Sequence, residues 1–100
     1  MEKMEKAGGY GIDPNDALAY NNRGDAYYNK GEYDRAVADY TEALRINPNN
    51  AIVYNNRGYA YKEKGEYDRA VADFTAALRI NPNYAGAKDG LEETRARQSR

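Results

Sequence analysis

The sequence predicts an all-α protein, a solenoid of antiparallel helical hairpins closed by a C-terminal capping helix. The chain repeats itself every 34 residues, because Ala17–Asn50 and Ala51–Tyr84 are identical at 26 of 34 aligned positions. Apolar residues recur at three- and four-residue spacings in each copy, which is typical of amphipathic helices. Glycine and proline occur at the same places in both copies, where helices are expected to end.

The first copy opens with a predicted helix over residues 17–30. Its tyrosines and a glycine recur three to four residues apart and form one face. Asn15 or Asp16 precedes the helix and is suited to cap its N-terminus. Gly31 follows it, and glycine readily adopts the left-handed conformation that ends many helices.

A second helix is predicted over residues 33–46, and Pro48 ends it because the residue before a proline is biased away from helical angles. The second copy repeats this arrangement, with Gly65 between its helices and Pro82 at its end. A hairpin cannot bury its apolar face alone, so the units are expected to stack. The apolar stripe of the second helix is Tyr33, Ala36, Val37, Tyr40, Ala43, Leu44 and Ile46, with its counterpart running from Tyr67 to Ile80.

The two ends of the chain are not complete copies. Tyr10–Asp16 aligns with Leu44–Asn50, so we interpret the N-terminal segment as the remnant of a preceding repeat. A mostly polar helix over 85–98, with Ala87 and Leu91 on one side, fits a cap on the last hairpin. The predicted organisation is an N-terminal segment at 1–16, repeats at 17–50 and 51–84, and a capping helix and tail at 85–100.

The repeated pattern resembles the tetratricopeptide repeat (TPR), in which W-x₂-L-G-x₂-Y, A-x₃-F and P recur within 34 residues. The copies read Tyr20-x₂-Arg23-Gly24-x₂-Tyr27, Ala36-x₃-Tyr40, Pro48 and Tyr54-x₂-Arg57-Gly58-x₂-Tyr61, Ala70-x₃-Phe74, Pro82. The resemblance implies a right-handed α-solenoid. It also implies that Gly24 and Gly58 lie where two helices approach most closely.

Arginine replaces the leucine of this pattern at Arg23 and Arg57. In the first copy the guanidinium is a candidate partner for Asp39, although Arg35, four residues before that aspartate, competes for it. Stacking over the neighbouring tyrosine rings is equally plausible, and contact with a ligand is a third possibility. The same three possibilities apply to Arg57.

Composition argues against several functions. The chain has 15 basic and 16 acidic residues, no cysteine and no histidine, so we expect no nucleic-acid partner, metal site or cofactor, and no enzyme activity. No apolar run approaches the roughly 18 residues that span a bilayer, so we expect a cytoplasmic protein with no membrane partner. The acidic residues shared by both copies are predicted at turns and on the surface: Glu32/Glu66, Asp34/Asp68 and Asp39/Asp73.

The positions that differ between the copies predict a binding surface. Five of the eight lie on the first helix, and several share one face. The TPR resemblance implies that first helices line a concave groove that holds a peptide or a partner helix; drift at free surface positions is the competing explanation. The predicted groove residues are Asn21, Asn22, Asp25, Tyr28, Asn55, Asn56, Tyr59 and Lys62.

Asparagine amides can both donate to and accept from a peptide backbone, and the resemblance implies this role for Asn22 and Asn56. TPR domains that clamp the C-terminal carboxylate of heat-shock chaperones need basic groove residues. Asn21, Asp25, Gly86 and Gly90 occupy the other clamp positions here, and only Asn56 matches. We therefore expect no chaperone clamp. We expect an aromatic or aliphatic ligand residue near Tyr59 and an acidic one near Lys62.

Two further interpretations stay open. The chain is also consistent with a truncated or designed repeat scaffold that has no specific ligand and self-associates through its open N-terminal repeat face. A third interpretation is an excised docking module of a larger enzyme.

Overall fold

The computed structural model describes residues 12–99 and contains five α-helices and no strand within that range. The helix ends agree with the predicted ones to within one residue. Residues 1–11 of the predicted N-terminal remnant, and Arg100 of the tail, lie outside the described residues. The helices are α1 (Ala17–Asn29), α2 (Tyr33–Ile46), α3 (Ala51–Lys64), α4 (Tyr67–Ile80) and α5 (Ala85–Gln98).

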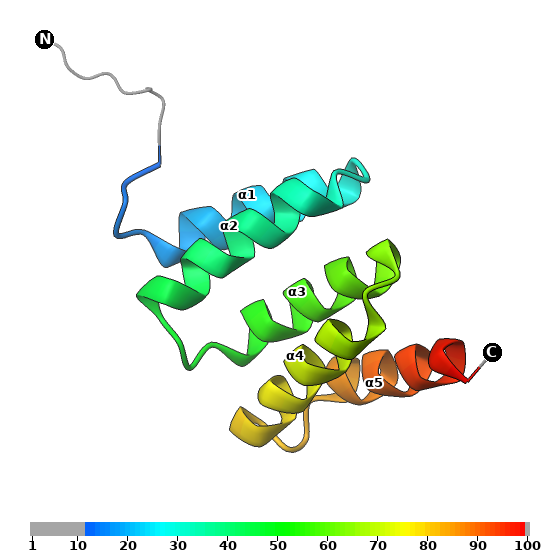
Figure 1. Ribbon diagram of the computed structural model, residues 1–100. Helices are drawn as coiled ribbons and strands as arrows, with labels where there is room; N and C mark the ends of the chain where they lie inside the picture. The colour runs from blue at the N-terminus through cyan, green and yellow to red at the C-terminus, as the bar shows by residue number, and fades with distance from the viewer. Residues whose placement is uncertain (1–11, 100) are drawn as a thin grey trace, which may run out of the picture.

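The five helices stack in chain order (Figure 1). α1 packs on α2 and α3 on α4, α2 joins the two hairpins by packing on α3, and α5 packs on α4. α1 and α5 each also contact α3. The predicted all-α solenoid with a capping helix is therefore confirmed.

The hairpin turns depend on two glycines with left-handed backbones. Gly31 has φ 79° and Gly65 has φ 81°, and in both cases a Cβ would meet no other atom within 4 Å. The backbone conformation, not lack of space, therefore requires glycine. At the other end of α1 the carboxylate of Asp16 accepts a hydrogen bond from the Ala19 amide at 3.0 Å, which makes it the N-cap.

The helical glycines lie against aromatic rings of the second helices. A Cβ on Gly24 would lie 2.7 Å from the Tyr40 ring, and a Cβ on Gly58 would lie 2.9 Å from the Phe74 ring. The predicted close approach is confirmed at both positions. Gly90 of α5 lies against the Phe74 ring as well, and a Cβ there would overlap the ring even more. Phe74 is therefore packed between glycines of α3 and α5.

The core consists of two clusters, and each includes a helix from the following unit. Val53 and Ala60 of α3 join the buried residues of α2, and Ala87 of α5 joins those of α4. Burial across these junctions holds the stack together. The predicted stripe was wrong at Ile80, which is 40% exposed because it lies in the last turn of α4, before the chain leaves the helix toward Pro82.

Each arginine that departs from the TPR pattern binds the aspartate of the second helix. Nε and one terminal nitrogen of Arg57 lie 2.8 and 2.9 Å from the two carboxylate oxygens of Asp73. Arg23 binds Asp39 at the same distances. The predicted surface position of Asp39 and Asp73 was wrong: both are buried, because the arginine neutralises them within the hairpin.

Neither competition from Arg35 nor stacking on tyrosine displaces these ion pairs. Arg35 and Arg69 pair with the glutamates three residues before them, and do not compete for the buried aspartates. The Arg57 guanidinium lies 5.8 and 5.7 Å from the ring centres of Tyr54 and Tyr61, so the ion pair and the tyrosine contacts coexist.

The two arginines differ in how far they are covered. Thr41 of α2 accepts a hydrogen bond from Arg57 at 3.1 Å, and the Arg57 side chain is 18% exposed. Arg23 has no preceding helix over it among the described residues and is 46% exposed. The arginine of the arginine–aspartate pair is therefore more buried where a helix of the preceding unit covers it.

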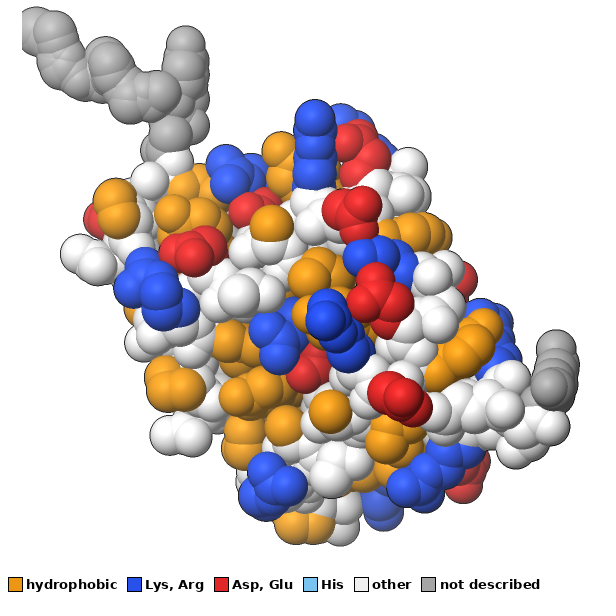
Figure 2. Space-filling view, viewed as in Figure 1, with side chains coloured by type: hydrophobic (Ala, Val, Ile, Leu, Met, Phe, Trp, Pro, Cys, Tyr) orange, Lys and Arg blue, Asp and Glu red, His pale blue; other side chains and the backbone are white. Residues whose placement is uncertain are grey.

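The surface in Figure 2 carries lysine, arginine, aspartate and glutamate side chains interspersed among hydrophobic ones. Within residues 12–99, none of the helices has both the length and the apolar character that a bilayer crossing requires.

Candidate functional site

A recess of about 450 Å³ opens between the first helices of successive units, α1 and α3. Five of the eight predicted groove residues line it, and Asn29 of α1 and Tyr40 of α2 complete its wall. The lining residues are Asp25, Tyr28, Asn29, Tyr40, Asn55, Asn56 and Tyr59. Asn21, Asn22 and Lys62 do not line the recess.

Two of the differences between the copies are physically coupled. In the first unit the Tyr40 hydroxyl donates to Oδ1 of Asp25 at 2.5 Å. In the second unit Phe74 and Tyr59 take these positions, and their rings meet edge to face with centres 4.9 Å apart. A polar pair in one unit thus corresponds to an aromatic pair in the other.

The capping helix fixes Tyr59 from the other side. The Tyr59 hydroxyl donates to the backbone carbonyl of Gly86 at 2.8 Å. Tyr28, its neighbour across the recess, is held at the edge of the Tyr33 ring, with ring centres 5.3 Å apart. Both groove tyrosines therefore have fixed ring orientations.

The four asparagines fall into different environments. Nδ2 of Asn56 donates to Oδ1 of Asn21 at 3.1 Å, which links α3 to α1 beside the recess. Asn22 is exposed at the N-terminal edge of the array. Asn55 is 8% exposed, and its Oδ1 receives no hydrogen bond from any described residue. A buried acceptor without a donor costs about 1–3 kcal/mol, so a donor that reached Asn55 would stabilise the protein.

Lys62 forms ion pairs with two glutamates of this chain. Its Nζ lies 2.6 Å from Glu93 of α5 and 3.8 Å from Glu63, and its side chain is only 5% exposed. This contact lowers the pKa of Glu93, through the hydrogen bond first and the charge of Lys62 second. The prediction that Lys62 binds an acidic ligand residue does not fit this neutralised and buried ammonium group.

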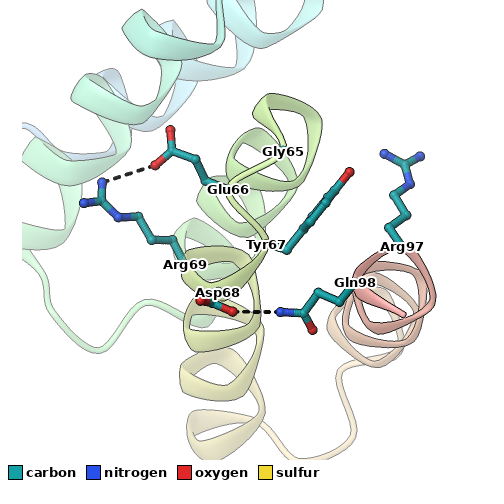
Figure 3. A pocket seen from close by; sticks show the side chains of 7 residues that line it. All are labelled: Gly65, Glu66, Tyr67, Asp68, Arg69, Arg97 and Gln98. Atoms are coloured by element: carbon teal, nitrogen blue, oxygen red, sulfur yellow. Dashed lines mark hydrogen bonds and ion pairs between the residues drawn. The ribbon is translucent and has the colours of Figure 1, made fainter. Parts of the chain in front are cut away.

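A second recess, of about 540 Å³, lies between the α3–α4 turn and the end of α5. Figure 3 shows Arg69 pointing to Glu66 and Gln98 pointing to Asp68, with Arg97 directed away from both carboxylates. The Gln98–Asp68 hydrogen bond is 2.8 Å long. None of the residues that line this second recess is buried. Its two carboxylates already bind other lining residues, Glu66 binding Arg69 and Asp68 binding Gln98. We therefore assign no site there.

Comparison with family models finds the TPR repeat over residues 24–65 and the tetratricopeptide repeat over residues 51–84. Together these matches span residues 24–84, from the middle of α1 to the end of the second repeat. The chain belongs to the tetratricopeptide-repeat family. Comparison with curated proteins found no significant match.

Solved TPR domains share this fold. The second TPR domain of human RPAP3, in complex with the HSP70 peptide SGPTIEEVD, has a TM-score of 0.81 and 28% identity over 83% of this chain and 69% of its own. The Sgt2 TPR domain of Aspergillus fumigatus has a TM-score of 0.81 and 31% identity over 83% of this chain and 55% of its own. The TPR2B–pHsp70 complex of yeast Sti1 has a TM-score of 0.78 and 28% identity, covering 80% of this chain and 64% of its own.

Sequence reasoning missed Tyr40 and Asn29 as lining residues of the recess between α1 and α3. Both are among the positions that differ between the copies, so the signal was present. Tyr40 was assigned to the core stripe, and its ring is buried as expected, but its hydroxyl reaches Asp25 in the recess.

The tyrosines that line the recess should make the fold sensitive to alkaline pH. Burial first, and the nearby Glu63 second, raise the pKa of Tyr28 to about 12. Burial also raises the pKa of Tyr59, and burial with the Asp25 hydrogen bond raises the pKa of Tyr40. The folded state therefore keeps protons that the unfolded chain loses from about pH 10, so stability should fall as pH rises above about 10.

Tyr40→Phe tests this interpretation. At pH 7 the variant should lose about 0.5–1.5 kcal/mol of stability, because Asp25 loses its donor. Above about pH 10 its free energy of unfolding should fall less steeply than that of the wild type, by up to about 1.4 kcal/mol per pH unit. Urea unfolding between pH 7 and 12 measures both effects, and an unchanged alkaline slope would contradict the assignment to Tyr40.

Proposed function

We propose that the chain is a non-catalytic interaction module that binds a peptide or a partner helix in the concave groove of its first helices. In this proposal residues 17–50 and 51–84 are the two TPR units, and residues 85–100 form the capping helix and tail. The groove residues are those predicted: Asn21, Asn22, Asp25, Tyr28, Asn55, Asn56, Tyr59 and Lys62, with Lys62 in a supporting position beneath Tyr59.

The recess between α1 and α3 carries the proposal. It brings the amides of Asn55 and Asn56 beside the rings of Tyr28 and Tyr59. Amides suit the donors and acceptors of a ligand backbone, and fixed tyrosine rings offer contact area at low entropic cost.

Related domains support a peptide ligand. The second TPR domain of human RPAP3 binds an HSP70 peptide, and TPR2B of yeast Sti1 forms a complex with an Hsp70 peptide. This chain has the same fold with a groove of only two first helices and the cap. We expect affinity in the micromolar range, roughly −8 kcal/mol, because a short groove buries little ligand surface.

A peptide-array screen tests the proposal with the variant Asn55→Ala/Asn56→Ala. Capture by the wild type should be lost or weakened about tenfold or more, since each lost hydrogen bond in a desolvated site costs about 1–3 kcal/mol. Asn49→Ala is the matched control, because Asn49 is exposed in the turn after α2. Unchanged capture by the double variant would exclude the groove.

A structural, self-associating role is favoured by one observation, the 46% exposure of Arg23 on the uncovered face of α1. A second copy seated there would cover Arg23 as α2 covers Arg57. Native mass measurement distinguishes the two functions: a dimer that captures no peptide supports a self-associating scaffold, and a monomer that captures peptides supports the interaction module.

A further inference from the structure

We propose that the recess binds the cationic side chain of an arginine or lysine, so that the groove selects basic peptides rather than acidic ones. This inference rests on the proposed function, because it specifies the ligand of the same groove. It is carried by the acceptors in the recess, by the two tyrosine rings and by the charge around them.

The recess presents hydrogen-bond acceptors without donors. Oδ1 of Asp25 receives the Tyr40 hydroxyl, whereas its Oδ2 receives no hydrogen bond from residues 12–99. The Asn55 side chain is more than nine-tenths buried, and its Oδ1 has no donor in that range. Lysine carries three N–H donors, arginine carries five, and neither has an acceptor. A cationic side chain therefore matches Asp25 directly, and it matches Asn55 once that amide, whose Oδ1 is itself buried, turns toward the recess.

Tyr28 and Tyr59 line the same recess and supply aromatic faces. An ammonium or guanidinium group within about 6 Å of a tyrosine ring centre is attracted to the ring. The protein already uses this contact, because Nζ of Lys62 lies 4.8 Å from the centre of the Tyr59 ring. A carboxylate on the ligand would be repelled by the negative faces of the same rings.

The surrounding charge is negative. Burial is the main cause of the raised pKa values of Tyr28 and Tyr59, and nearby carboxylates add to it: Glu63 and Glu93 at Tyr28, and Glu93 and Asp89 at Tyr59. Lys62 is the cation found beside them, and its ammonium group is buried against Glu93 and Glu63. Together with Asp25 these are four carboxylates, and the cations that act on them are Lys62 and, at Glu93, also Arg97.

Gly86 of the capping helix lies beside Asn55. A Cβ built on Gly86 would be in ordinary van der Waals contact with Nδ2 of Asn55, at 3.6 Å. At this position and at Gly90 the chain lacks the basic residues that a carboxylate clamp requires. The recess therefore offers acceptors for a basic side chain, and none of the residues that line it is a cation that could hold an acidic C-terminus.

A titration with four short labelled peptides of glycine, serine and alanine tests this proposal. Their central residue is arginine, lysine, glutamine or glutamate, and SGPTIEEVD serves as an acidic reference. Fluorescence polarisation should show the arginine and lysine peptides binding about tenfold or more tightly than the others, since a charge-assisted hydrogen bond contributes about 1.5–3 kcal/mol. The side-chain amide NMR signals of Asn55 and Asn56 should shift with the same two peptides.

Asp25→Asn is the diagnostic variant, because it removes the charge and keeps an acceptor for Tyr40. The preference for arginine and lysine over glutamine should fall about tenfold. Glu42→Gln is the matched control: it removes the same charge from an exposed site on α2, where Glu42 binds Arg45, and should leave the preference intact. Thermal melts of both variants check that they fold.

The outcomes separate the two proposals. Tighter binding of the glutamate peptide or SGPTIEEVD, with shifts at Asn55 and Asn56, would overturn the cationic preference and leave the peptide-binding function standing. Binding of the arginine peptide that shifts neither amide, or that Asp25→Asn does not weaken, would also overturn it. If the array screen captures peptides but none of these five binds, the cationic preference alone fails. If no peptide binds in either the array screen or the titration, both the proposed function and the cationic preference are overturned.

Discussion

Gly58→Leu should lower the free energy of unfolding by about 2–3 kcal/mol, the upper part of the range for overpacked cores. Even the first added carbon would lie 2.9 Å from the ring of Phe74, which is fully buried and cannot move aside. Leucine is the better helix former by almost 1 kcal/mol, so any loss of stability reports the contact. Thermal unfolding should show the midpoint falling by roughly 10 °C or more.

Gly90→Leu should have a similar effect, because a Cβ built there would overlap the same ring. Gly86→Leu is the comparison on the same helix: a Cβ there would lie 3.3 Å from the Tyr84 side chain, which must shift only by a few tenths of an ångström, so the loss of stability should be smaller than at Gly90. Equal melting points for all three variants would mean that Phe74 does not need the two glycines.

Asp73→Ala should cost about 3 kcal/mol, because it leaves the largely buried Arg57 without its carboxylate. A double-mutant cycle with Arg57→Leu isolates the energy of the Arg57–Asp73 pair. Arg57→Leu also removes the hydrogen bond to Thr41, but it does so with and without Asp73, so this loss cancels in the cycle. We expect a coupling energy of about 1–3 kcal/mol from urea unfolding.

The first unit provides the matched comparison. Arg23 and Asp39 have the same bidentate geometry, but Arg23 is 46% exposed where Arg57 is 18% exposed. Water and salt screen the exposed guanidinium, so the coupling should fall to about 1 kcal/mol or less. Equal coupling in both units would show that the covering helix contributes nothing to the strength of the pair.

The fold could be predicted because several local signals agree in both copies. The 34-residue period, the glycines at the turns and the prolines after the second helices each place a helix end within one residue of its observed position. Ile80 was misplaced because the apolar stripe of a helix does not say whether another element covers its last turn.

The candidate site was only partly accessible to the same reasoning. Helix spacing places Asp25 and Tyr28 on one face of α1, and the repeat places Tyr59 at the corresponding position of α3. All three line the recess. It does not determine side-chain partners between helices, so neither the pairing of Lys62 with Glu93 nor the missing donor at Asn55 could be inferred. The alignment identifies Tyr40 and Phe74 as a difference between the copies, but it does not show that the Tyr40 hydroxyl binds Asp25.

The coupled pairs have a consequence for how such a chain can change length. Recombination between near-identical copies adds or removes 34 residues at a time. A crossover between units keeps Asp25 with Tyr40 and Tyr59 with Phe74. A crossover inside a unit, between the first and second helix, would set a carboxylate against phenylalanine, or a tyrosine hydroxyl against the Tyr59 ring, and leave a polar group without its partner. Exchange of a whole unit therefore keeps these two pairs, whereas exchange of half a unit breaks them.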